Sequence, residues 1–179
     1  MSEFTTYENS GYIQNKTQKQ TLIVESKMTT SDNSFSIDLY EPFIIDKYSD
    51  IYLDSFTTYN AVKNDTDVKN CGFILKINEF KIKSNIASAA SDSKTNNDIH
   101  RSNKVASIFI PNSANATPAQ TFTHKIKKFN YVTDEYPQTI SKISGTLTNS
   151  GTDASPPVYG TAFHGTGRFI AEFLIISRD

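Results

Sequence analysis

Hydrophobic and polar residues alternate with a period close to two along much of the chain after residue 20. In residues 34–40 the odd positions from Phe35 to Leu39 are apolar and the positions between them are polar. This alternation is typical of a β-strand with one buried face. Similar patterns predict eight strands, at residues 21–26, 34–40, 51–59, 73–83, 105–110, 121–132, 140–147 and 168–177. We find no segment with the pattern of an amphipathic helix.

Two of these segments depart from simple alternation. In residues 73–83 the apolar phase changes between Ile77 and Phe80, which predicts a β-bulge or a bend near Asn78 and Glu79. Residues 168–177 are apolar at both odd and even positions over much of their length. We therefore expect this last strand to be buried on both sides.

Eight strands separated by turn-rich segments predict an all-β fold, an eight-stranded antiparallel jelly-roll sandwich. Residues 84–103 and 149–166 are rich in small and polar residues and are expected to be long exposed loops. Residues 1–19 are polar and without sustained periodicity, so we expect an N-terminal arm. Residues 20–179 then form a single jelly-roll domain.

Composition narrows the possible functions. The chain has 179 residues, enough to bury a core without a disulfide or a metal, and its only cysteine, Cys71, is expected to be a small buried strand residue. The formal net charge is −1, which gives no field to attract nucleic acid or an anionic membrane. The basic run Lys125, Lys127 and Lys128 is expected to be the solvated face of a strand. No secretory signal or membrane span is expected, so the protein should be soluble.

Candidate catalytic and metal-binding groups are sparse. The three histidines, His100, His124 and His164, lack the spacing of a metal site, and His124 is expected to be a buried, hydrogen-bonded strand residue. The aspartate pairs 65/67 and 92/98 are expected to lie in solvated turns, and the sequons at residues 15, 64 and 115 are expected to be unused. We therefore predict no catalytic, cofactor or metal site. A cupin-like enzyme would need clustered His and Glu ligands that the sequence does not offer.

Aromatic residues are more frequent than a small sandwich core requires. There are 12 Phe and 9 Tyr. Aromatic side chains are enriched at protein–protein interfaces. Tyr7, Tyr12, Tyr48 and Tyr136 lie outside the clean strand patterns, and these four are the predicted interface residues.

Five segments run in order along most of the chain, at residues 46–58 (DKYSDIYLDSFTT), 73–80 (FILKINEF), 108–112 (IFIPN), 127–132 (KKFNYV) and 167–176 (GRFIAEFLII). Together they resemble the single jelly-roll penton proteins of the nucleocytoplasmic large DNA viruses. Each is a strand with its turn, and none is a catalytic signature.

This resemblance implies a structural capsid protein of a giant virus and not an enzyme. It implies a homopentamer at the fivefold vertices of an icosahedral capsid, in contact with the major capsid protein and other capsid proteins, with no cofactor. The protein would be found in the virion and assembled in the host cell cytoplasm. Since jelly rolls also host lectins, a carbohydrate- or receptor-binding module is the alternative.

Overall fold

The computed structural model describes residues 18–27, 34–59, 72–84, 106–113, 121–126, 130–149 and 167–178. These residues form nine β-strands and no helix. The strands are β1 (Lys19–Lys27), β2 (Ser34–Ile45), β3 (Ser49–Tyr59), β4 (Gly72–Ile77), β5 (Ile108–Pro111), β6 (Thr121–Thr123), β7 (Tyr131–Glu135), β8 (Gln138–Asn149) and β9 (Arg168–Ser177). In the described part of the chain no helix has the length and hydropathy of a membrane span.

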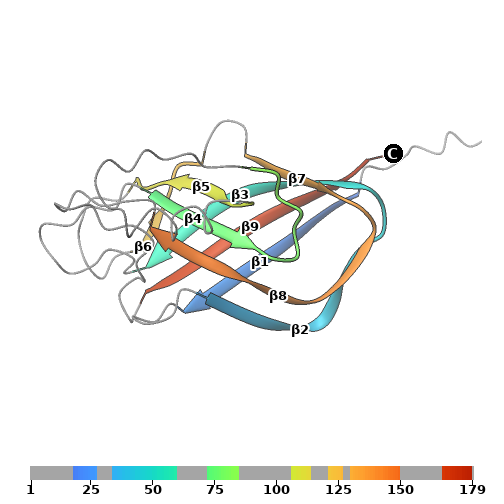
Figure 1. The fold of residues 1–179 in the computed structure, drawn as a ribbon, viewed down its shortest axis with the longest axis horizontal. Coiled ribbons are helices and arrows are strands. Elements are labelled where there is room, and N and C mark those ends of the chain that lie inside the picture. Colours follow the sequence, from blue (N-terminus) through green and yellow to red (C-terminus); the bar gives the residue numbers. More distant parts are fainter. Residues whose placement is uncertain are drawn as a thin grey trace, which may run out of the picture.

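The strands form two antiparallel sheets that pack face to face (Figure 1). In sheet A the order is β1-β9-β3, and both β6 and β7 pair with the free edge of β3. In sheet B the order is β2-β8-β4-β5. The prediction of an all-β antiparallel sandwich is therefore confirmed.

The strand count differs from the predicted eight at one place. Residues 121–132 were expected to form one strand, but they contribute β6 and the first residues of β7, which pair with opposite ends of β3. Between them His124 donates its backbone N–H to the Phe56 carbonyl (2.8 Å), and Leu53 donates to the Asn130 carbonyl (2.8 Å). Because β6 and β7 share one edge of β3, the two sheets have eight strand positions.

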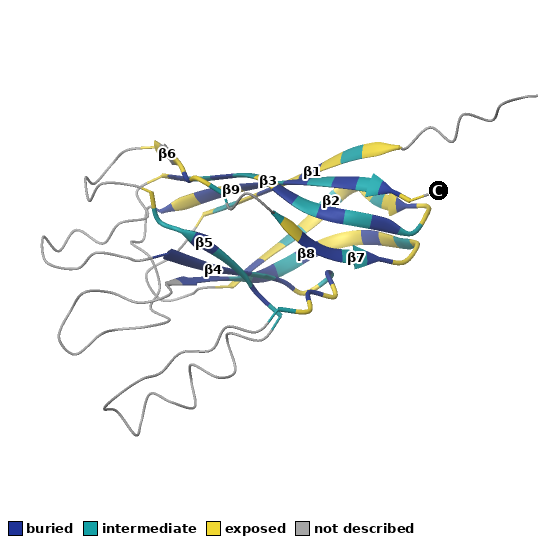
Figure 2. Cartoon of the chain, turned by 90° about the horizontal axis from the view of Figure 1, so that it is seen from above, coloured by how far each residue is buried: buried dark blue, intermediate teal, exposed yellow. Residues whose placement is uncertain are grey.

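The core lies between the sheets and is filled by every second residue of most strands, as the dark bands along the strands in Figure 2 show. Aromatic pairs bridge the two layers. Phe35 of sheet B packs against Phe169 of sheet A with ring centroids 5.2 Å apart, and Phe56 packs against Phe73 at 5.4 Å. Burial of such rings is the main source of stability in a sandwich without disulfides.

The predicted bend after Ile77 is confirmed. β4 ends at Ile77, and Asn78 and Glu79 form a turn. The Asn78 backbone N–H donates to the Ser144 carbonyl (2.9 Å), and a Glu79 carboxylate oxygen accepts the Ser144 backbone N–H (2.9 Å). These bonds tie the turn to β8, so Phe80 and the residues after it follow a new direction.

The expectation that the last strand is buried on both sides is wrong for a single chain. β9 is the central strand of sheet A, and its inward residues Phe169, Ala171, Phe173 and Ile175 are almost completely buried. Its outward residues are partly exposed, and Ile170 is 38% exposed. The apolar outward residues suggested that both faces of β9 are covered. In the described part of the chain, however, no segment lies over the outer face of sheet A.

The outer faces of the two sheets differ in character. On sheet B the outward residues of β2 and β8 are mostly polar (Ser34, Ser36, Asp38, Lys142, Ser144 and Thr146), and the exposed apolar residues of β2 are Tyr40 and Ile44. On sheet A the outward residues include Ile23, Ile170, Leu174, Ile176, Tyr52 and Tyr131. Sheet A therefore presents the more apolar face to its surroundings.

The predicted N-terminal arm falls almost entirely outside the described residues. Lys19 already belongs to β1, and the Gln18 backbone N–H donates to the Ser177 hydroxyl (2.9 Å). The sheet thus begins slightly earlier than the predicted domain start at residue 20. Both chain ends of the sandwich, Gln18 and Arg178, lie at the same end of sheet A.

Candidate functional site

Four tyrosines gather at the end of sheet A where the chain makes its short turns. Tyr48 lies between β2 and β3, Tyr136 between β7 and β8, and Tyr52 and Tyr131 are paired on β3 and β7. The rings of Tyr48 and Tyr136 are 5.1 Å apart, and those of Tyr52 and Tyr131 are 5.7 Å apart with an edge-to-face tilt. We call these four residues the tyrosine cluster.

Charged side chains hold the tyrosine cluster in place. Asp134 accepts hydrogen bonds from the hydroxyls of Tyr48 and of Tyr131, the latter at 3.0 Å. Arg178 donates two hydrogen bonds to the Asp50 carboxylate, one of them from Nε at 2.8 Å, and its guanidinium lies 5.0 Å from the Tyr48 ring centre. The rings are therefore ordered before any partner arrives, which reduces the entropy lost on binding.

The same contacts fix the charge state of the tyrosine cluster. Hydrogen bonds from Tyr48 and Tyr131 lower the pKa of Asp134. Burial, together with the hydrogen bond to Asp134, raises the pKa of Tyr131 to about 12. The pKa of Tyr48 is raised mainly by its own hydrogen bond to Asp134. The carboxylate therefore stays ionised and the hydroxyls stay neutral donors near neutral pH. This chemistry suits recognition more than proton transfer.

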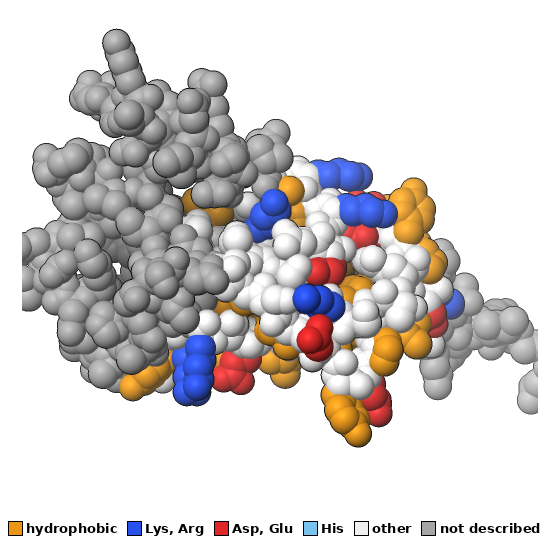
Figure 3. Space-filling model, turned by 60° about the horizontal axis from the view of Figure 1, so that its bottom comes forward, with side chains coloured by type: hydrophobic (Ala, Val, Ile, Leu, Met, Phe, Trp, Pro, Cys, Tyr) orange, Lys and Arg blue, Asp and Glu red, His pale blue; other side chains and the backbone are white. Residues whose placement is uncertain are grey.

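Large apolar side chains remain exposed on the described surface, and Figure 3 shows such groups among mainly polar neighbours. Within the tyrosine cluster, Tyr136 is 64% exposed and Tyr131 is 47% exposed. Outside it the exposed large side chains are Ile23, Tyr40, Ile44, Tyr59 and Ile170. Exposed aromatic rings that are already held in place are typical of contact residues at protein interfaces.

Two of the four predicted interface residues, Tyr48 and Tyr136, are thus brought together. Tyr7 and Tyr12 lie outside the described residues. Sequence reasoning missed Tyr52 because it reads as an ordinary outward strand position, and it missed Tyr131 because the pattern of residues 121–132 placed Tyr131 among the apolar positions, whereas it is 47% exposed. Their register on β3 and β7 was needed to place them side by side.

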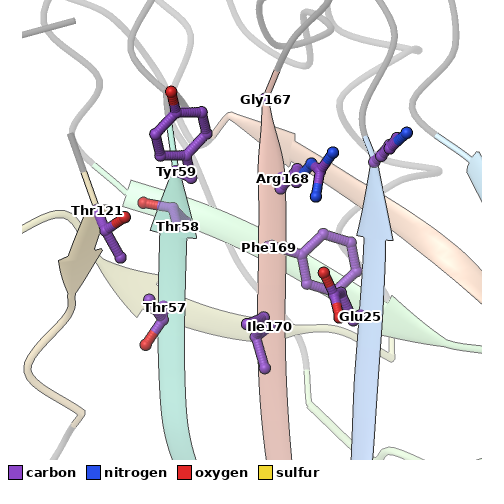
Figure 4. A pocket seen from close by; sticks show the side chains of 10 residues that line it. Glu25, Thr57, Thr58, Tyr59, Thr121, Gly167, Arg168, Phe169 and Ile170 are labelled. Carbon is purple, nitrogen blue, oxygen red and sulfur yellow. The ribbon is translucent and has the colours of Figure 1, made fainter. Parts of the chain in front are cut away.

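A pocket of about 640 Å³, shown in Figure 4, is lined by residues of β1, β9 and β3. The strand register places it at the end of sheet A opposite the tyrosine cluster. Tyr59 of β3 is paired with Arg168 of β9, which in turn is paired with Lys27 of β1. Two residues further along β9, Ile170 is paired with Thr57 on one side and with Glu25 on the other. We call this the Lys27/Arg168 pocket.

His124 lies beside the same end of the sheet but points into the core, where it is 2% exposed. Its Nδ1 accepts the backbone N–H of Ser113 (3.1 Å), so Nε2 carries the proton and donates to the Thr58 hydroxyl (2.6 Å). The ring also packs against Phe73 at 4.7 Å. The expectation of a buried, hydrogen-bonded histidine is confirmed.

This environment predicts a pH dependence of stability. Burial lowers the pKa of His124 from 6.5 to about 4. The unfolded chain therefore takes up a proton at a pH where the folded chain does not, and stability falls as the pH drops from about 6.5 toward 4. Between about pH 7 and pH 5 we expect a loss of about 1–2 kcal/mol from this residue, after allowing for solvent screening.

Urea unfolding of the wild type and of His124→Gln at both pH values measures the effect. The variant should lose less stability than the wild type over this range, because glutamine does not titrate. Equal losses in the two proteins would show that His124 has no part in the pH dependence.

The remaining sequence candidates form no second site within the part of the chain that the structure describes. Among the described residues there is no group of three or more His, Cys, Asp or Glu side chains placed to hold a metal ion. Cys71, His100, His164, the two aspartate pairs, the three sequons and Lys127 and Lys128 all lie outside the described residues.

No protein-family model matches this chain, and comparisons with curated proteins and with solved structures find no significant match. The tyrosine cluster and the Lys27/Arg168 pocket are the two candidate contact regions of the described residues.

Proposed function

We propose that this chain is a jelly-roll capsid subunit that forms a homopentamer at the fivefold vertices of an icosahedral virus. The strand order carries the proposal. If β6 and β7 are counted as one strand, the strands can be renumbered one to eight along the chain. Their spatial order is then 1-8-3-6 in sheet A and 2-7-4-5 in sheet B. This order supports a jelly roll, in which an eight-stranded antiparallel ribbon is rolled into two sheets, an architecture found in viral capsid proteins and in lectins.

Self-association is supported by the outer face of sheet A. The tyrosine cluster and the aliphatic residues of β9 remain partly exposed there, while the outer face of β2 and β8 is mostly polar apart from Tyr40 and Ile44. When a neighbouring subunit covers an exposed apolar face, apolar surface is removed from water and the free energy falls. The position at the vertex is proposed from the resemblance to penton proteins. The same resemblance is the basis for the major capsid protein as partner, for assembly in the host cytoplasm and for the lack of a cofactor.

Localisation within particles tests the proposal. Antibodies against this chain, applied to purified particles of the source virus, should label the fivefold vertices and leave the faces of the shell unlabelled. Labelling spread over the whole shell would make the chain a general shell subunit. If neither intact nor opened particles are labelled, the vertex role is contradicted.

A second function is a carbohydrate- or receptor-binding module. The Lys27/Arg168 pocket favours it, because a partly exposed Tyr59 ring beside charged Arg168 and Glu25 can stack on a sugar and bind its hydroxyl groups. A glycan array probed with the wild type and with Tyr59→Ala separates the two functions. Binding that disappears in the variant supports the module, and an array without signal removes it.

A further inference from the structure

A bulge in β2 produces the most exposed aromatic side chain of the described surface. Between Asp38 and Phe43 the strand advances five positions, while its partner β8 moves only from Lys142 to Ile140, two positions, so three extra residues are pushed out of the ladder. Tyr40 in this bulge is 101% exposed. Its neighbours Asp38 and Glu41 are also exposed. We call residues 38–42 the β2 bulge.

The β2 bulge is a negatively charged projection. Within the described part of the chain neither Asp38 nor Glu41 forms an ion pair. β2 is an edge strand, and Pro42 removes one backbone donor from that edge. This makes simple pairing with another strand less favourable, so any contact here depends on the side chains.

The Lys27/Arg168 pocket has the complementary character. Lys27 and Arg168 are exposed and, among the described residues, take part in no ion pair. Glu25 is the only acidic residue among the described groups that line it, which leaves the lining with a net positive charge. Ile170 and the ring of Tyr59 supply a partly exposed apolar surface, 38% and 40% exposed.

We infer that the β2 bulge of one copy binds in the Lys27/Arg168 pocket of a neighbouring copy. The inference rests on the proposed self-association and names its contact. Tyr40 packs on Ile170 and Tyr59, and the Asp38 and Glu41 carboxylates face Lys27 and Arg168. An aromatic anchor surrounded by charge pairs is a common way to build an interface hot spot.

The location of the two patches fits a ring of subunits. The β2 bulge lies on the edge strand of sheet B, whereas the Lys27/Arg168 pocket lies over β1, β9 and β3 of sheet A. Two different patches meet in each contact, so the contact is heterologous. Such contacts repeat around a closed ring or along an open chain of subunits and do not form an isolated twofold dimer.

A charge exchange across the contact tests the inference. Sedimentation equilibrium of the full chain gives the dissociation constant of self-association for the wild type, Arg168→Glu, Glu41→Arg and the double variant. Each single variant places like charges together and should weaken association by about tenfold or more. The double variant should recover most of the loss. Tyr40→Ala should weaken association without such a rescue.

Lys19→Glu is the matched control. Lys19 is an exposed cation on β1, at the opposite end of the strand from Lys27 and outside both patches, so its reversal should leave the dissociation constant unchanged. Since all substituted side chains are exposed, circular dichroism and melting temperature should match the wild type for every variant.

The outcomes separate this inference from the proposed function. If the wild type associates but the single variants do so equally well, the contact is overturned while the vertex role stands. A wild type that stays monomeric up to millimolar concentration overturns the contact, and the vertex role is then judged on particles. A monomer whose pocket binds a sugar, with binding lost in Arg168→Glu, overturns the contact in favour of the binding module.

Discussion

Replacing Gly145 with alanine is expected to lower the free energy of unfolding by several kcal/mol, on the order of 3 or more. Gly145 lies in β8 between β2 and β4, where it is paired with Phe35 and Ile77. A Cβ atom there would overlap the backbone carbonyl oxygen of Lys76 and come within 2.8 Å of the Phe35 ring. Because the oxygen belongs to a strand held on both sides, relief requires a shift of the sheet itself.

Urea denaturation followed by circular dichroism measures the effect, with Thr146→Ala as the control. Thr146 is the next residue on β8 and points to the outer face, so its truncation should cost less than about 1 kcal/mol. A Gly145→Ala protein as stable as the wild type would show that β4 and β8 are further apart than described.

Truncation of Phe56 to alanine is expected to cost about 3–5 kcal/mol. Phe56 is completely buried and packs against Phe73 across the sandwich, against Phe169 on the neighbouring strand and against the His124 ring. Its removal leaves a cavity between two sheets that cannot close without moving several aromatic rings.

Tyr40→Ala is the matched control, since it also removes an aromatic ring but from a fully exposed site. At concentrations where the chain is monomeric, its unfolding free energy should stay within about 0.5 kcal/mol of the wild type. Equal losses in Phe56→Ala and Tyr40→Ala would contradict the position of Phe56 at the centre of the core.

Strand positions were predictable where one face is buried and alternation is clean. The last strand was predicted at residues 168–177 and is observed as Arg168–Ser177. β2 was predicted to end at residue 40 but continues to Ile45, because Glu41 and Pro42 interrupt the alternation at the bulge. In β8 the apolar phase changes between Ile140 and Ile143, opposite that bulge, so neither strand shows a clean period there.

Surface features were less predictable because they depend on pairing between distant segments. Tyr48 and Tyr136 were chosen for lying outside the strand patterns, and the structure places their rings in contact. The roles of Asp134 and Arg178 in ordering the tyrosine cluster required the alignment of β3 with β7 and β9. In the same way, the apolar residues on the outer face of β9 were visible in the sequence, but their partial exposure was not.

The proposed vertex role is tested most directly by the copy number of this chain in purified virus particles from its source, relative to the major capsid protein. Twelve vertices with five copies each predict about sixty chains per particle. Quantitative mass spectrometry with isotope-labelled peptides of both proteins gives this ratio. A value near sixty supports the pentameric vertex subunit, whereas absence from the particles or thousands of copies would contradict it.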